Sequence, residues 1–376
     1  GEQPFWMVIA LSCMLGQIGL PGGGFGFGYS ATNFIGGNFV IPPAAAFPQG
    51  INQVKDFIPV ARISDLLLHP GKNFKFDGKN YLYPDTKIVY WAGGNPFHHH
   101  QDLSLLMKAW QKPETVICNE WCWNSLAKRS DIVLPCTTPL EREDLAITPR
   151  DPYIIKMSKL TEPYGDSRDD FDIFSGIAKV MGKLDHFTDG KSKEEWQKWI
   201  YNETKKKSLE QNINMPSYDD FIQKGWFKFP DHSEDVIMLE DFRADPINSK
   251  LNTPSGKIEI FSETINGFGY DDCPGHPVWL EPCEWLGQKD KKYQLHLISN
   301  QPKDKLHSQL DHGKFSRSNK INGREPVFIN KKDAIKRNLK DKDLVQVYND
   351  RGSCYASVVI DNNLRSGVIL ISTGAW

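Results

Sequence analysis

Trp91-Ala-Gly-Gly-Asn-Pro-Phe-His-His-His-Gln-Asp102 is the segment of this sequence that constrains the fold most tightly. It lies directly after the apolar run 87–90 and directly before the helical pattern 103–110. Two glycines after a strand let backbone N–H groups come close to an anion, and a following helix presents its positive end. The segment therefore predicts a phosphate-cradling turn formed by Gly93, Gly94, Asn95 and Pro96.

Three short strands are expected around this turn, alternating with helices. The apolar runs 87–91, 115–119 and 132–134 are separated by helical patterns that end near residues 112 and 128. Short strand–helix–strand connections predict parallel pairing in a doubly wound α/β sheet. Ligands of such sheets bind beyond the carboxyl ends of the strands.

Three loops would meet at that edge. They are the glycine turn, the polar residues Asn119, Glu120 and Trp121, and the segment 135–138. A polar side chain after a strand is placed to contact a nucleotide's ribose or base. A solvated turn at 119–121 is the alternative.

The C-terminal region changes character. Short alternating strands are expected at 294–298, 327–329, 344–348, 355–360 and 368–371, with a helix at 331–338, which predicts a β-barrel-like domain. Polar loops follow its first strand, and their donors and acceptors suit a heterocycle rich in N–H and C=O groups. Their residues are Ser299, Asn300 and Gln301, then Leu306, His307, Ser308 and Gln309. An ordinary polar loop is the alternative.

Charge is distributed unevenly along the 376 residues. The formal net charge is −2, but residues 291–342 hold fourteen Lys and Arg against five Asp and Glu. The near-neutral total gives no drive towards nucleic acid. The basic stretch is either a solvated face or a site for an anion such as a dinucleotide pyrophosphate.

These patterns divide the chain into four expected parts. Residues 1–80, with a helix at 4–19, a glycine-rich loop at 21–28 and a helical pattern at 60–69, form the tail of a truncated α/β domain. Residues 81–160 form the dinucleotide-binding α/β domain, and 161–290 a helical and irregular connecting region. Residues 291–376 form the barrel-like domain, truncated at its end.

Several other chemistries find no support in the sequence. The three consecutive histidines 98–100 point in different directions from a helix, so they are not expected to share one metal ion. A single one of them, His98, is expected to hydrogen-bond a pyrophosphate or pterin group. The seven cysteines contain no CxxC pair, and neither a P-loop nor a G-x-S-x-G elbow occurs. The apolar segment 5–20 is too short to span a membrane.

Long strings of residues resemble the dimethyl sulfoxide reductase family of molybdenum enzymes, in particular its biotin sulfoxide and trimethylamine N-oxide reductase branch. The strings lie at 15–25, 61–65, 90–102, 130–135, 253–262, 296–302 and 306–309. The resemblance implies a bis(molybdopterin guanine dinucleotide) molybdenum cofactor and a C-terminal domain of the double-psi barrel type. It also implies that the glycine turn holds a guanine dinucleotide, with further contacts at Asn119-Glu120, Arg168 and Asp170. Asp131, in the string 130–135, is a further candidate contact, and a short strand with a proline stop is the alternative reading of that string.

The activity that the resemblance implies is oxygen-atom transfer from an S-oxide or N-oxide, such as biotin sulfoxide, dimethyl sulfoxide or trimethylamine N-oxide. An unidentified electron donor would supply two electrons per turnover. Members of the family are about twice this length, and the serine that ligates their molybdenum lies in their amino-terminal half. The chain is therefore expected to be the C-terminal half of such an enzyme, without a metal ligand of its own.

Two further interpretations remain open. The chain could be an inactive truncated fragment or a non-catalytic dinucleotide-binding module. Formate dehydrogenase and nitrate reductase relatives are disfavoured, because the matching strings are closer to those of the oxide reductases.

Overall fold

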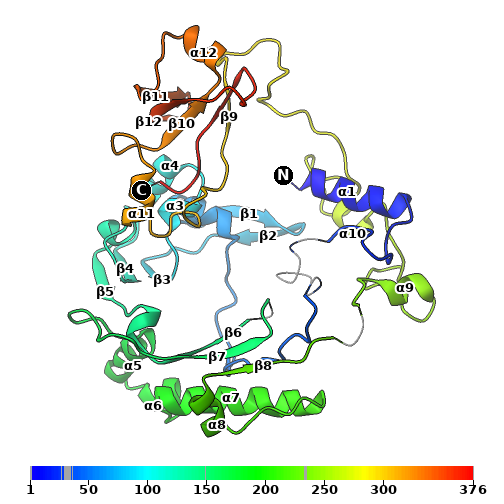
Figure 1. Cartoon of the computed structure of the whole chain (residues 1–376), viewed down its shortest axis with the longest axis vertical. Coiled ribbons are helices and arrows are strands. Elements are labelled where there is room, and N and C mark those ends of the chain that lie inside the picture. Colours follow the sequence, from blue (N-terminus) through cyan, green and yellow to red (C-terminus); the bar gives the residue numbers. More distant parts are fainter. Residues whose placement is uncertain are drawn as a thin grey trace.

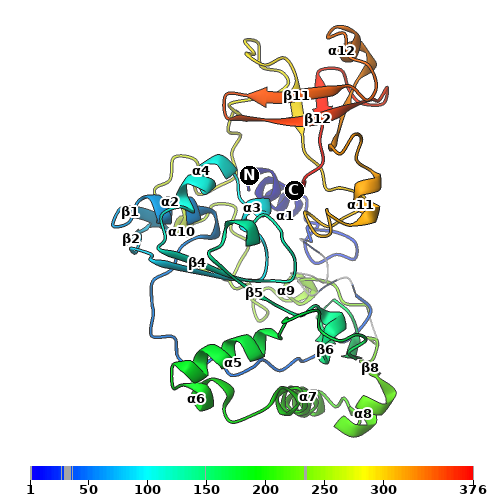
Figure 2. The ribbon, with the colours of Figure 1, turned by 90° about the vertical axis from the view of Figure 1, so that its left-hand side faces the viewer.

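The computed structural model describes residues 2–26, 28, 35, 37–148, 150–232 and 235–375 (Figure 1). A central parallel sheet lies between a C-terminal sheet and a layer of helices, and helix α1 (Gln3–Met14) lies to one side. Figure 2 shows the same three levels from the side. The expected loop 21–28 is described except for residue 27, and position 376 also lies outside the described residues.

Helix α1 occupies the apolar N-terminal segment. Pro4 lies in its first turn, where a missing N–H costs no helical hydrogen bond, and Gly16 follows its end with a φ of +66°. Its apolar residues are distributed around the helix rather than along one stripe, and Met7, Leu11 and Met14 remain exposed. The turn η1 (Val60–Arg62), helix α2 (Ile63–Leu68) and the hairpin β1–β2 (Asn73–Phe76, Lys79–Leu82) come next.

The expected parallel sheet is present. Strands β3 (Ile88–Ala92), β4 (Thr115–Glu120) and β5 (Ile132–Pro135) pair side by side in that order. Ala92 is paired with Asn119, and Glu120 with Pro135, so the three strands end at one edge. This register brings the predicted loops to the same edge.

Helices cover both faces of this sheet. Neighbouring residues of a strand point to opposite faces. Trp91 packs against Trp110, at the end of α4 (Leu103–Ala109), with ring centroids 5.9 Å apart, whereas Tyr90 packs against Phe174 of α5 (Asp170–Val180) at 5.3 Å. The core beneath α2 and α4 includes Leu106 and Leu126, both fully buried.

The helix expected after the glycine turn is divided in two. A single turn, α3 (Pro96–His99), is followed by a break before α4. Asp102 causes the break, since it adopts a φ of +49° and its carboxylate accepts a hydrogen bond from the N–H of Leu105 at 3.0 Å. Helix α3 is too short to carry much of a dipole, so any anion at the turn is held mainly by backbone N–H groups.

An antiparallel sheet that the sequence patterns did not predict joins the next region. Strands β6 (Asp144–Ile147), β7 (Tyr153–Met157) and β8 (Trp226–Lys228) pair in order, so this sheet crosses the expected boundary at residue 160. Its core contains Tyr201 and Phe221. The helices beside it are α5, α6 (Leu184–Thr188), α7 (Lys193–Glu210) and α8 (Tyr218–Lys224). Helix α7 begins with a capping box between Ser192 and Glu195.

The segment 235–290 has little regular structure, as expected. It contains the short helices α9 (Glu240–Ala244) and α10 (Glu263–Asn266). Within the described residues, every helix falls short of the length or the apolar character that a membrane crossing requires.

The C-terminal domain is a curled, open, five-stranded sheet. Its strands are β9 (His296–Ile298), β10 (Pro326–Ile329), β11 (Leu344–Asn349), β12 (Gly352–Ile360) and β13 (Val368–Leu370). They lie in the order β11-β12-β10-β13-β9, with parallel and antiparallel pairs alternating. Helices α11 (Lys314–Ser318) and α12 (Lys331–Ile335) interrupt the strands. The open edges at β11 and β9 give a half-barrel, and the double-psi topology remains a prediction.

Candidate cofactor site

The glycine turn has the geometry that close approach of a ligand requires. Gly93 and Gly94 adopt φ values of +85° and +77°, which side-chain-bearing residues rarely adopt. A Cβ at Gly93 would contact no atom within 4 Å, and one at Gly94 would reach only the ring nitrogen of Trp91, at 3.8 Å. Both residues are exposed, so their backbone is open to a ligand. Asn95 and Pro96 are buried behind them, and Asn95 caps α3 by accepting from the N–H of Phe97 at 3.1 Å.

A hydrogen-bond chain links the end of β4 to helix α5. The hydroxyl of Tyr90 donates to Asn119 Oδ1 at 2.8 Å, and Asn119 Nδ2 donates to Asp170 Oδ1 at 2.7 Å. Asn119 is buried, whereas Asp170 is exposed at the first turn of α5. The two predicted residues, 51 positions apart in sequence, therefore lie together at the sheet edge. Tyr90, which carries no signal of its own in the sequence, positions them.

Glu120 lies beneath the same edge. Its carboxylate accepts hydrogen bonds from the side-chain amide of Asn124 and from the N–H of Trp121 at 3.0 Å. Burial raises the pKa of the Glu120 carboxyl, and the two hydrogen bonds act against that shift. With its acceptors already engaged, Glu120 serves to hold the 120–124 turn in place, and the exposed ring of Trp121 projects from that turn.

Arg168 pairs with the third loop, residues 135–138, at the same edge of the sheet. Its backbone N–H donates to the carbonyl of Pro135 at 3.1 Å, and its own carbonyl accepts from the N–H of Thr137 at 3.1 Å. Its side chain is exposed, and in the described part of the chain the guanidinium makes no hydrogen bond or ion pair. A guanidinium at the strand ends that is not already paired suits an anionic ligand.

Asp131 does not join this group. It precedes β5 and accepts a hydrogen bond from the N–H of Val116, near the start of β4, at 2.7 Å. It therefore lies at the amino end of the sheet, opposite the other predicted residues. Its role in this structure is to fix the start of two neighbouring strands.

The polar loops of the C-terminal domain are bound to one another and to the last described segment. Ser299 Oγ donates to the carbonyl of Ile371 at 3.0 Å, and Ser372 Oγ donates to Asn300 Oδ1 at 3.0 Å. The amide of Gln301 lies 3.2 Å from His307 Nδ1. Gly374 passes so close to this loop that a Cβ there would lie 1.8 Å from the carbonyl oxygen of His307.

Residues 306–309 form an exposed turn around a buried serine. Leu306 and Gln309 are exposed, and the N–H of Gln309 donates to the carbonyl of Leu306 at 2.9 Å. His307 adopts a φ of +51°, and Ser308 is buried. The turn therefore exposes Leu306, His307 and Gln309 and buries Ser308.

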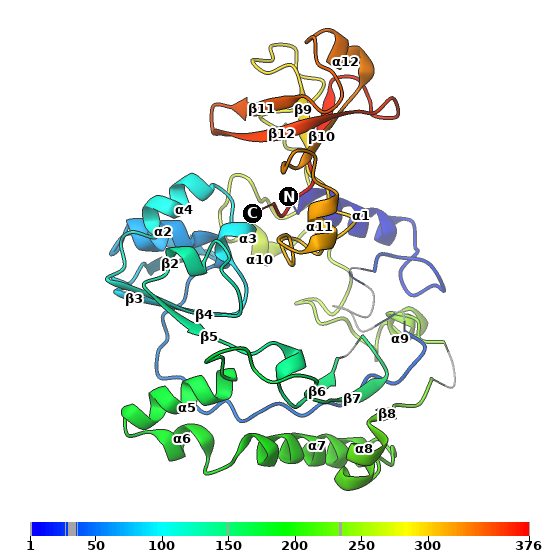
Figure 3. The ribbon, with the colours of Figure 1, turned by 60° about the vertical axis from the view of Figure 1, so that its left-hand side comes forward.

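The sheet-edge loops and the C-terminal loops meet (Figure 3). The ring of His99 lies 5.6 Å from that of His307, and the ring of Trp121 lies 5.6 Å from that of His312. In Figure 3, α11 and its loop lie beside α3. Helix α3 and the turn after β4 therefore contact the C-terminal loops.

His98 is a neutral member of this junction. Its Nε2 lies 3.0 Å from Ser125 Oγ, and desolvation lowers its pKa to about 4, although the Asp311 charge acts in the opposite direction. At neutral pH the ring therefore acts as a hydrogen-bonding group and not as a cation. Within the described residues no group of three His, Cys, Asp or Glu side chains is arranged to hold a metal ion.

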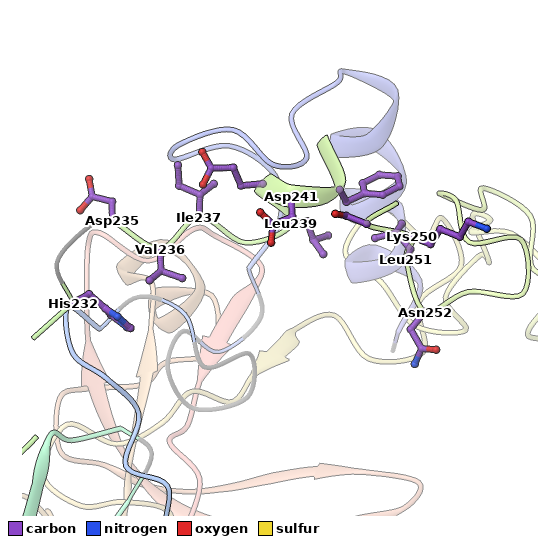
Figure 4. Close-up of a pocket in the computed structure, with 12 residues that line it drawn as sticks. His232, Asp235, Val236, Ile237, Leu239, Asp241, Lys250, Leu251 and Asn252 are labelled. Carbon is purple, nitrogen blue, oxygen red and sulfur yellow. The ribbon is translucent and has the colours of Figure 1, made fainter. Parts of the chain in front are cut away.

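A further cavity lies away from the junction of the two sets of loops. The one in Figure 4 is lined by residues between His232 and Asn252, and its side chains are spread along the chain without converging on a common point. None of the predicted site residues lines it. The junction of the two sets of loops is therefore the better candidate.

Comparison with known proteins shows which families the chain resembles. Residues 1–180 match the family described as molybdopterin oxidoreductase, and residues 295–376 match the molydopterin dinucleotide binding domain. Biotin sulfoxide reductase of Cereibacter sphaeroides is 42% identical over 377 residues, which cover all of this chain and 50% of that protein. The dimethyl sulfoxide/trimethylamine N-oxide reductase of the same organism is 40% identical, and so is trimethylamine-N-oxide reductase of Haemophilus influenzae.

The chain spans about half the length of these relatives, with 47% and 48% of the latter two covered. Among solved structures, acetylene hydratase from Pelobacter acetylenicus superposes with a TM-score of 0.59 at 19% identity, over 78% of this chain and 38% of its own. At that identity the likeness concerns the fold.

Proposed function

Because the chain belongs to the molybdopterin oxidoreductase family, we propose that it forms the dinucleotide-binding part of a molybdenum-dependent S-oxide or N-oxide reductase. The observation that carries the proposal is the meeting of the sheet-edge and C-terminal loops in a chain 40–42% identical to such reductases along its whole length. The cofactor proposed is bis(molybdopterin guanine dinucleotide) molybdenum. When bound, it supplies two-electron oxygen-atom transfer.

The residues present fit a guanine dinucleotide. The open backbone of Gly93 and Gly94 suits phosphate oxygens, and the exposed guanidinium of Arg168 suits the same charge. Asp170 uses one carboxylate oxygen to accept from Asn119, which leaves the other for the N–H donors on the edge of a guanine. The polar residues 299–301 and 306–309 offer donors and acceptors to a pterin.

These residues bind and orient the cofactor, and no residue of the chain is assigned as a ligand of the metal. The electron donor, the particular oxide and the remaining half of a full-length enzyme stay predictions drawn from the relatives. The non-catalytic binding module is the alternative, and the half-length coverage of the relatives is the observation in its favour.

The proposal is tested first by titrating the purified chain with GDP in a calorimeter. Asp170→Asn keeps the shape of the side chain but removes a charged acceptor, so affinity should fall about tenfold to a hundredfold. Asp166→Asn, at an exposed aspartate of the preceding loop, is the matched control and should bind like the parent. Equal affinity in the parent and both variants would contradict the assignment of the guanine site.

A second measurement separates the enzyme from the binding module. Protein purified from cells that make the cofactor is assayed for reduced-viologen oxidation with biotin sulfoxide, dimethyl sulfoxide and trimethylamine N-oxide, alone and with the amino-terminal half of the Cereibacter relative. Turnover in either case supports the reductase. GDP binding without turnover in both supports the module.

A further inference from the structure

A second cavity, lined mainly by residues with charged side chains, lies where the parallel-sheet unit meets the C-terminal domain. It has a volume of about 630 Å³ and lies between the turn after β4 and the loop that carries α11. Ser125, which contacts His98, is on its wall, but the predicted cofactor residues are not. The residues that line it are Ser125, Lys128, Arg129, Asp311, His312, Arg317, Lys320 and Gly323.

Positive charge in this cavity exceeds what the described part of the chain neutralises. Asp311 is the one carboxylate among the lining residues, and Lys305 and Lys320 engage its two oxygens, the latter at 2.7 Å. Lys305 and Lys320 also pair with Glu325, at 3.0 and 3.1 Å. These four residues, the ionic quartet, balance one another. Their two positive and two negative charges sum to zero.

Three cationic side chains therefore remain without an anionic partner in the described part of the chain: Lys128, Arg129 and Arg317. Arg129 is oriented by donating to the carbonyl of Ser125 at 2.9 Å and by lying 4.8 Å above the ring of Phe97. Two of the three come from the turn after β4 and one from α11. Like charges from two separate parts of the chain would repel one another unless an anion or solvent separates them.

Buried ion pairs hold the part of the cavity wall that carries Arg317 in place. The side chains of Lys305 and Asp311 are 2% and 3% exposed, so the ionic quartet is buried beneath the loop that begins α11. A buried, fully paired network of this kind holds its loop in one position. The cavity is therefore preorganised, because its charged lining does not need to assemble around a ligand.

We propose that this cavity is a binding site for a phosphate-type dianion, which bridges the parallel-sheet unit and the C-terminal domain. Two guanidinium groups, an ammonium group and the Ser125 hydroxyl match the several acceptor oxygens of a phosphate, and guanidinium binds such oxygens in pairs. A phosphate of the proposed cofactor and a free phosphate or pyrophosphate are the two possible sources. The site itself does not depend on the proposed reductase activity.

The test is calorimetric titration of the cofactor-free chain with inorganic pyrophosphate at constant ionic strength. The double variant Lys128→Gln/Arg317→Gln should weaken binding about tenfold or more, since two charged contacts are lost. The control Lys331→Gln/Lys336→Gln removes the same charge from exposed positions on and beside α12 and should bind like the parent. The site is disproved if pyrophosphate does not bind, or if both double variants bind it equally.

Two further arms identify the source and separate this proposal from the previous one. If the cofactor supplies the dianion, cofactor-loaded protein should no longer take up pyrophosphate. If the ligand is a free anion, loaded and cofactor-free protein should bind it alike. Asp170→Asn should reduce GDP affinity without changing pyrophosphate affinity. Loss of both together would overturn the assignment of a separate cavity.

Discussion

The parallel-sheet unit and helix α1 are both rich in apolar residues, but those residues end in opposite environments. Leu106 and Leu126 are fully buried in the sheet unit, whereas Leu11 and Met14 of α1 are 49% and 76% exposed. Helices cover the sheet on both faces, and nothing in the described structure covers α1 to the same degree. An apolar helix without a polar face is typical of a surface that packs against further polypeptide. Apolar sequence thus indicates where a surface is to be covered, and neighbouring segments decide whether it is.

The difference between buried and exposed side chains should change the free energy of unfolding most for charged residues. Lys305→Met leaves Asp311 and Glu325 buried with one cation between them, which should cost about 3–5 kcal/mol of unfolding free energy. Lys292→Met removes an exposed pair with Asp350 and should leave the denaturation midpoint almost unchanged. Urea denaturation of both variants measures this, and similar midpoints would contradict the importance of burial here.

The contribution of Lys305 to stability depends on pH in a definite direction. Burial lowers the pKa of Lys305, but its hydrogen bonds to Asp311 and Glu325 prevail and raise it above the usual value of 10.5. The contribution of Lys305 to stability is therefore fully present below pH 10.5 and is lost as the pH rises through the raised pKa. A Lys305→Met protein should lack this alkaline loss.

Matched leucine truncations test the comparison directly. Leu126→Ala opens a cavity in the core of the sheet unit and should cost about 2–5 kcal/mol. Leu11→Ala on α1 should change stability by about 0.5 kcal/mol or less in the isolated chain. If Leu11→Ala is as costly as Leu126→Ala, then α1 is already covered in solution, for example by a second copy of the chain.

Two glycine substitutions compare the backbone of the glycine turn with that of a helix interior. Gly93→Ala forces a side chain into a φ of +85° and should cost about 1–2 kcal/mol, as well as hindering the approach of a ligand. Gly176→Ala, in the interior of α5 with open space around it, should stabilise the chain by about 0.5–1 kcal/mol. Thermal denaturation reports both effects, and shifts of the same sign would be inconsistent with the turn geometry.

A pH dependence is also expected at the junction of the loops. The folded pKa of His98 is about 4, below its ordinary value of 6.5, so the unfolded chain binds more protons between these values. Stability should therefore fall as the pH is lowered from 6.5 towards 4. His98→Gln should reduce that fall, whereas His186→Gln, at an exposed position on α6, should follow the parent.

Much of the parallel-sheet unit could be predicted from sequence, and the reason is local. Each of its strands is an apolar run that ends in glycine, asparagine or proline, and β3, β4 and β5 lie within one or two residues of their expected bounds. Strands β6 to β8 were missed because they are three to five residues long and are interrupted by polar side chains. The pairing of β8 with β7 also depends on contacts between segments about seventy residues apart, which local patterns do not encode.

The candidate site also contains residues that sequence patterns predict and residues that they do not. Residues after strand ends, such as Asn119, were placed correctly, because parallel strands end together. Asp131 lies away from the other predicted residues, since a residue that precedes a parallel strand lies at the amino edge of the sheet. The ionic quartet had no signal, because its members are irregularly spaced charges in a loop and only the fold reveals that they are buried.

Gly374 gives the C-terminal segment a mechanical role. Its backbone lies against the carbonyl of His307 so closely that only a residue without a side chain fits. A pull or twist on the last residues would therefore displace the turn that carries His307. A tag attached at this end would act on the same turn, and a flexible spacer would relieve it.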